Sequence, residues 1–191
     1  MTRNDIQEKA LKICLPYTRC SLCLTMRTGK TKLALTHMSK SMVGRSPKFL
    51  VVAPKKSIFK SWVEDAKKFE LAYLLEYITF STYLSLKKQD LDYDGIYLDE
   101  VHSLLPSHET WLDAYKGKIL GLTGTSPKYG LSDKAMLIEK YCPSVYEYLI
   151  DDAVEDGIIN DYQIIVHTIP LSSEKTYQKK TKDGRFWILL N

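Results

Sequence analysis

Long apolar runs are missing from this chain of 191 residues. The longest, such as residues 49–54, is far shorter than the roughly 20 residues that a membrane-spanning helix needs. The chain starts with Met-Thr-Arg-Asn-Asp, which contains no apolar signal core. We therefore expect a cytoplasmic protein with no membrane partner.

Glycine, proline and cysteine are also scarce, at 9, 7 and 4 residues. This composition excludes collagen-like, mucin-like and wholly disordered chains, and the absence of a repeat of about 20 to 50 residues argues against a solenoid. Cys20 and Cys23 form a Cys-x-x-Cys pair, but Cys14 and Cys142 do not form the second pair that a zinc site would need. We interpret the cysteines as small apolar residues rather than metal ligands or a disulfide.

No sign of charge dominates, because 27 Lys and Arg face 23 Asp and Glu, for a net charge of +4. Such a modest excess does not by itself indicate a polyanionic partner, so the distribution of charge must decide. At this length we expect one domain over residues 1–171, followed by a tail or linker over residues 172–191.

The sequence alternates between short apolar runs and amphipathic segments. We expect strands at residues 21–25, 49–53, 77–80, 95–98, 118–123 and 162–169. We expect helices at residues 4–15, 31–44, 57–69, 134–141 and 148–155. Apolar strands separated by helices predict an α/β domain of three layers, with a mostly parallel sheet covered by helices on both faces. Ligands of such sheets bind beyond the carboxyl ends of the strands.

Residues 24–31, Leu-Thr-Met-Arg-Thr-Gly-Lys-Thr, follow the first strand and open a helix, which is the context of a phosphate-binding P-loop. In such a loop, backbone N–H groups hold phosphates, Lys30 pairs with the β and γ oxygens, and Thr31 binds magnesium. Leu24 replaces the usual first glycine of the motif, and Arg27 stands where many relatives have another. A simple surface turn is the alternative.

Asp99 and Glu100 directly follow an apolar strand, where charges without a partner would be costly to bury. A magnesium ion held by Thr31 and Asp99 would solve this problem, and Glu100 would orient and deprotonate the water that attacks the γ-phosphate. The alternative is a solvated acidic loop. We predict Lys30, Asp99 and Glu100 as the catalytic residues, with ATP and Mg²⁺ as cofactors.

Three motifs together resemble the first RecA-like domain of superfamily 2 helicases and translocases, particularly the Snf-type and phage branch. They are the P-loop, the DEAD/DEAH-like Asp-Glu-Val-His at residues 99–102, and Leu-Gly-Leu-Thr-Gly-Thr-Ser-Pro at residues 120–127, which is similar to motif III. The resemblance extends from Gln7 to about Leu171 and implies a P-loop RecA-like domain, in the host cytoplasm if a phage encodes it.

The resemblance also assigns residues to the nucleotide site and its coupling to nucleic acid. Gln7 resembles the upstream glutamine that reads adenine, although an exposed glutamine on a helix is also commonplace. The residues predicted to bind nucleotide are thus Gln7, Met26, Arg27, Thr28, Gly29, Lys30 and Thr31. His102, Thr123, Gly124 and Thr125 would couple the nucleotide state to the nucleic-acid path. His102 would contact motif III or a partner domain, or could serve only as a polar residue at a helix start.

The segment from Val51 through Trp62 is similar to the Snf-type motif Ia, which implies phosphate contacts from Pro54, Lys55, Lys56 and Ser57. A helix N-terminus beside two lysines fits a backbone phosphate, although a solvated basic face is the alternative. We interpret Trp62 as a core residue rather than a base-stacking platform.

Ser81 and Thr82 resemble motif Ib and would make a second phosphate contact, while Tyr83 could simply pack. Phosphate contacts do not separate DNA from RNA. The Snf-type resemblance favours DNA.

The resemblance implies an ATPase motor domain that works with a second RecA-like domain, in cis or in trans. The second domain supplies arginine fingers, which are worth about 10³ to 10⁵ in rate in related enzymes, so we expect weak ATP hydrolysis from this chain alone. The alternatives are a catalytically degenerate module that binds nucleic acid or a protein partner without turnover and, as a poorer fit, a small-molecule kinase.

Overall fold

The computed structural model describes residues 1–42, 46–125 and 132–161. The strands are β1 (Arg19–Leu24), β2 (Phe49–Ala53), β3 (Ile78–Thr82), β4 (Gly95–Asp99), β5 (Lys118–Thr123) and β6 (Ser144–Tyr148). The α-helices are α1 (Arg3–Cys14), α2 (Lys30–Ser41), α3 (Ser57–Lys68), α4 (Glu109–Ala114), α5 (Asp133–Tyr141) and α6 (Ile150–Glu155). Short 3-10 helices are η1 (Ala72–Tyr77), η2 (Tyr83–Lys88), η3 (Val101–Ser103) and η4 (Pro106–His108).

The strands form one sheet in the order β3-β2-β4-β5-β1-β6, and every neighbouring pair is parallel. All six carboxyl ends therefore lie at one edge of the sheet. The predicted α/β fold with a mostly parallel sheet is confirmed.

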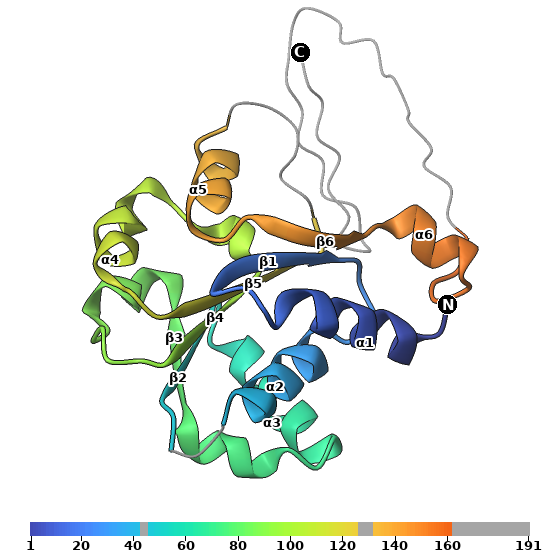
Figure 1. The fold of residues 1–191 in the computed structure, drawn as a ribbon, viewed down its shortest axis with the longest axis horizontal. Helices are drawn as coiled ribbons and strands as arrows, with labels where there is room; N and C mark the ends of the chain where they lie inside the picture. The colour runs from blue at the N-terminus through green and yellow to red at the C-terminus, as the bar shows by residue number, and fades with distance from the viewer. Residues whose placement is uncertain (43–45, 126–131, 162–191) are drawn as a thin grey trace, which may run out of the picture. The chain divides into compact units, whose positions relative to one another are not determined.

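Helices cover both faces of this sheet, with α1, α2 and α3 on one side and α4 and α5 on the other (Figure 1). The alternation of side chains along β2 shows how the sheet serves two cores. Val51 packs with α1, α2 and α3, whereas Leu50 and Val52 pack with η2, α4 and α5. The five residues of β2 are all buried, which explains its continuous apolar sequence.

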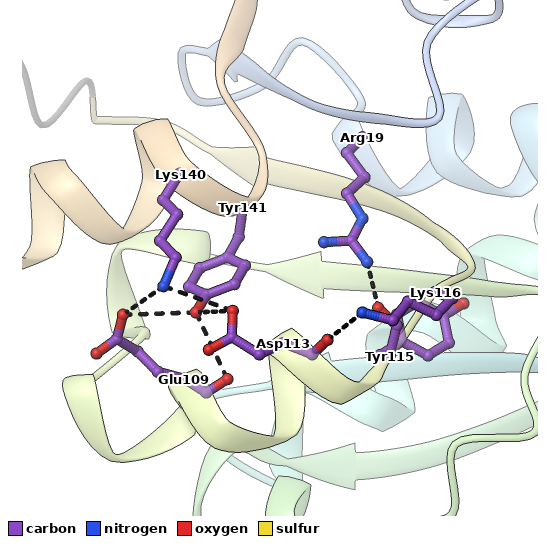
Figure 2. Close-up of polar contacts among 7 residues, drawn as sticks. All are labelled: Arg19, Glu109, Asp113, Tyr115, Lys116, Lys140 and Tyr141. Carbon is purple, nitrogen blue, oxygen red and sulfur yellow. Dashed lines mark hydrogen bonds and ion pairs between the residues drawn. The ribbon is translucent and has the colours of Figure 1, made fainter.

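Polar contacts connect α5 to α4 (Figure 2). The hydroxyl of Tyr141 donates to Asp113 Oδ1 at 2.8 Å, and Lys140 Nζ lies 3.1 Å from Glu109 Oε1. The Lys140–Glu109 pair is exposed enough to contribute little. The buried ring of Tyr141 therefore does most to hold the two helices together.

Three parts of the sequence prediction differ from the structure. Residues 144–148 form strand β6, which was not expected, and the helix predicted from residue 148 begins at Ile150. The β6 strand has five residues and, within the part of the chain that the structure describes, pairs with β1 alone. Its formation depends on that pairing rather than on a strong local pattern. The short α4 was not predicted either.

The predicted strand at residues 162–169 and the domain boundary near Leu171 lie outside the described residues. Met1–Asn160 form one compact unit. Among the described residues, no helix combines the length and apolarity needed to cross a bilayer.

Candidate nucleotide site

The strand order brings three predicted loops together at the carboxyl edge of the sheet. Strand β5 lies between β4 and β1, so motif III is flanked by the acidic pair and the P-loop. In register, Asp99 pairs with Leu122, which pairs in turn with Leu22. Parallel pairing therefore places these loops at one level of the sheet.

The P-loop is held by its own backbone and side chains. Thr28 is fully buried, and its hydroxyl donates to the carbonyl of Thr25 at 2.7 Å. Gly29, the residue before α2, has a φ of +84°, and Arg27 has a φ of +64°. Arg27 thus has a left-handed backbone at a position where many P-loops have a glycine. Because the Thr28 hydroxyl is engaged with Thr25, the backbone N–H is the donor of Thr28 that is suited to bind a phosphate.

Lys30 begins α2, and its Nζ donates to the carbonyl of Leu24 at 3.1 Å. A methyl group added at Gly124 would lie 3.3 Å from the same nitrogen. Gly124 of motif III is thus packed against the P-loop lysine.

Gln7 lies against the P-loop, where its Nε2 donates to the carbonyl of Thr28 at 2.7 Å. A side chain at Gly29 would collide with this amide. The 21 residues that separate Gln7 from Thr28 are spanned by α1 and β1. The structure therefore places Gln7 at the nucleotide loop, while its contact with adenine stays a prediction.

Asp99 ends β4 with its side chain 9% exposed. Burial raises the pKa of this carboxyl group, while a hydrogen bond from Trp62 and the charge of Lys30 act in the opposite direction. Trp62 Nε1 donates to Asp99 Oδ2 at 2.9 Å, and the hydroxyl of Tyr83 donates to the backbone carbonyl of Asp99 at 2.9 Å. Two donors from outside β4 therefore hold Asp99 in place.

Glu100 and His102 form the turn after β4. Glu100 is half-buried, with a left-handed φ of +51°. His102 Nδ1 lies 2.9 Å from the hydroxyl oxygen of Thr123 and 3.5 Å from Glu100 Oε2. The hydroxyl of Thr123 also contacts the backbone of Thr125. The expected contact between His102 and motif III is therefore present, and it connects the acidic pair to that motif.

The donor set at this edge fits magnesium. The Thr31 hydroxyl and the Asp99 carboxylate are hard oxygen donors, and Asp99 is a buried carboxylate that a cation would stabilise. Within the described residues, no three His, Cys, Asp or Glu side chains form a protein-only cage. Magnesium does not require one, because water and phosphate oxygens usually complete its coordination.

The predicted nucleic-acid residues lie directly after β2 and in the last two positions of β3, and these strands are neighbours in the sheet. Ala53 pairs with Thr82, so the two following loops start side by side. Lys55 and Lys56 are exposed and lead into α3 at Ser57, as predicted.

Ser81 and Thr82 differ in their exposure. Ser81 is 4% exposed, and its hydroxyl donates to the carbonyl of Thr82 at 3.3 Å. The Ser81 side chain does not face solvent in this conformation, and its phosphate contact stays a prediction. Thr82 is half-buried and is the hydroxyl of this pair that solvent can reach.

Sequence reasoning identified Trp62 as a core residue and Tyr83 as a residue that could pack, and both are buried. It missed that both donate hydrogen bonds to Asp99. A buried indole N–H or phenol O–H needs an acceptor, which was the available signal. The sequence alone could not indicate which acceptor.

Comparison with known proteins supports the fold. No family model matches this sequence, and no curated protein matches it significantly. Solved structures do match. The chain shares its fold with domains of solved helicases and of a SWI2/SNF2 ATPase core.

The UvsW helicase of bacteriophage T4 matches with a TM-score of 0.63 and 13% identity, over 73% of this chain and 58% of that one. The Hef helicase domain of Pyrococcus furiosus matches with a TM-score of 0.57 and 18% identity, over 77% of this chain and 38% of that one. The SWI2/SNF2 ATPase core of Sulfolobus solfataricus, solved with double-stranded DNA, matches with a TM-score of 0.53 and 20% identity, over 69% and 34%. The matches thus span about a third to less than two thirds of those chains.

Proposed function

We propose that this chain is the ATP-binding motor domain of a DNA helicase or translocase, which hydrolyses ATP with Mg²⁺ to drive movement on nucleic acid. The observation that carries the proposal is the meeting of the P-loop, the acidic pair and motif III at one edge of a parallel sheet. Each loop contributes side chains of the type that phosphoryl transfer to water requires.

The proposed roles follow from the positions of the residues. Backbone N–H groups from Met26 to Gly29 and the start of α2 would bind the phosphates, with Lys30 pairing to the β and γ oxygens. Thr31 and Asp99 would hold a magnesium ion, which supplies charge neutralisation at the phosphate oxygens. Glu100 would orient the attacking water and accept its proton.

The segment after β2 and the end of β3 are proposed to contact a nucleic-acid backbone through Pro54, Lys55, Lys56, Ser57 and Thr82. Two exposed lysines at a helix start favour a phosphate. DNA is the proposed partner because the Sulfolobus ATPase core was solved with double-stranded DNA. A second RecA-like domain, in cis or in trans, is proposed as the further partner because this chain covers only part of the helicases it matches.

Replacing Lys30 with Ala should weaken Mg²⁺-dependent ATP binding at least tenfold, because this residue is the proposed cation for the β and γ oxygens. Lys40→Ala is the matched control, since Lys40 is an exposed lysine near the end of the same helix. Binding of a fluorescent ATP analogue with and without Mg²⁺ measures the effect. Equal affinities in the two variants would contradict the proposed site.

Glu100→Gln should abolish the slow ATP hydrolysis and leave nucleotide binding intact, because an amide cannot accept the proton from water. Phosphate release under single-turnover conditions measures this, with binding of the same analogue as the control. The degenerate-module alternative is favoured by the departures from the motif at Leu24 and Arg27. It predicts no hydrolysis in the unsubstituted chain and no effect of this variant.

A further inference from the structure

Two segments that were assigned to nucleic-acid contact also touch the acidic pair. Trp62 lies on α3, which begins directly after Lys55 and Lys56, and its indole Nε1 donates to Asp99 Oδ2 at 2.9 Å. Tyr83 directly follows Thr82, and its hydroxyl donates to the Asp99 carbonyl at 2.9 Å. Asp99 is therefore held by donors from the helix after β2 and from the turn after β3.

The hydrogen bond from the Trp62 indole ends on the carboxylate of Asp99, which is the group proposed to bind the metal. Trp62 is 1% exposed and packs in the core on the α1, α2 and α3 face of the sheet. Its ring therefore cannot change rotamer without disrupting the packing of that core. Its N–H is a donor only, which suits the ionised carboxylate. A carboxylate with one oxygen fixed in this way presents its remaining lone pairs in a defined direction.

We propose that Trp62 is a positioning residue for metal binding, which orients the Asp99 carboxylate toward the magnesium ion of the bound nucleotide. This inference rests on the proposed function, because it assumes that Asp99 holds the metal. Trp62 thereby links the segment that carries the exposed lysines to the metal carboxylate. Removing a group that hydrogen-bonds to a metal ligand and orients it typically lowers the metal affinity about 10- to 100-fold.

Trp62→Phe tests the inference, because phenylalanine keeps an aromatic ring in the core but has no N–H. Trp111→Phe is a matched control. Trp111 is 7% exposed, and its Nε1 donates to the Gln89 carbonyl at 2.8 Å, in the opposite core. Both variants lose one indole hydrogen bond from a buried tryptophan, but only Trp62→Phe loses a bond to Asp99.

The measurement is the Mg²⁺ concentration needed for half-maximal binding of a fluorescent ATP analogue. We expect Trp62→Phe to need about 10-fold or more Mg²⁺, and Trp111→Phe to match the unsubstituted chain. A purely structural role for Trp62 would lower the thermal midpoint without changing this Mg²⁺ dependence. Equal Mg²⁺ dependence in the two folded variants would overturn the inference.

A spectroscopic measurement decides the matter if Trp62→Phe does not fold. The sequence contains three tryptophans, so the indole N–H region of a nitrogen-15 spectrum is simple to assign. Addition of Mg²⁺ to the protein with bound ADP should shift the Trp62 signal and leave that of Trp111 in place. In that case an unmoved Trp62 signal would overturn the inference.

The same experiments separate the two proposals. If the unsubstituted chain binds nucleotide in a Mg²⁺- and Lys30-dependent manner while Trp62→Phe behaves as Trp111→Phe does, the inference fails and the proposed function stands. If the unsubstituted chain shows no such binding, both proposals fail.

Discussion

At the scale of single residues, Arg27 and Glu100 share an unusual backbone conformation. Their φ angles of +64° and +51° lie in the left-handed region, where a residue with a Cβ atom is disfavoured by about 1 to 2 kcal/mol. Both residues lie in turns that form the candidate nucleotide site. Such conformations persist where the surrounding structure enforces them, and they are common at functional sites.

Replacing Arg27 with Gly should therefore raise the free energy of unfolding, by about 0.5 to 1 kcal/mol, since relief of the left-handed backbone exceeds the entropy cost of glycine. Arg27→Ala is the control, because it removes the same charge but keeps the Cβ atom. Urea unfolding measures both. A gain in stability with alanine as large as that with glycine would contradict a backbone origin.

At the scale of secondary-structure elements, α2 connects the P-loop to the body of the sheet. His37, two turns after Lys30, is 4% exposed, and its Nδ1 lies 2.8 Å from the hydroxyl oxygen of Tyr97 in β4. Burial, with a smaller contribution from the charge of Lys118, lowers the pKa of His37 to about 4. The imidazole is therefore neutral at physiological pH and serves as an uncharged link between helix and sheet.

Acidification should weaken the fold through His37. The unfolded chain binds a proton at His37 near pH 6.5, whereas the folded protein does so only near pH 4. The free energy of unfolding should thus fall between those pH values, by about 3 kcal/mol at the lower end. In His37→Asn, this part of the pH dependence should disappear. Urea unfolding from pH 7 to pH 4 measures it, and identical pH slopes in the two proteins would show the prediction to be wrong.

Element formation was predictable where the local pattern was strong. Helix α3 begins at Ser57, as expected, because apolar residues such as Ile58, Trp62 and Ala66 recur at helical spacing. Strand β5 spans the expected Lys118–Thr123. Strand β6 was missed, because its five residues become a strand by pairing with β1, and that pairing is not encoded within the segment.

At the scale of the whole molecule, all four cysteines are buried, with Cys14 and Cys20 in the apolar core on one face of the sheet and Cys142 in the core on the other face. Burial raises the pKa of Cys14 to about 11, and that of Cys20 and Cys142 to about 12. Cys23 is 1% exposed. The thiols of Cys14, Cys20 and Cys142 are therefore protonated at neutral pH, and all four thiols are shielded from solvent, which suits the role of small apolar residues.

A thiol reagent at pH 8 should therefore label none of the four cysteines in the folded protein within minutes and all of them in denaturant. Lys60→Cys supplies an exposed control thiol on α3 that should react at once. Counting adducts by intact-mass measurement gives the answer. Rapid labelling of a native cysteine in the folded protein would contradict the burial of that thiol.

The sequence by itself determined the α/β class, most of the strands and helices, and the residue types expected of the P-loop and the acidic pair. These features depend on local patterns of apolar, small and charged residues. The tertiary structure decided which of them meet. Strand order set β5 between β4 and β1, and side-chain packing brought Trp62 to Asp99 across 37 residues of chain. Adjacency of this kind arises from pairing and burial between distant segments, for which no single segment carries the information.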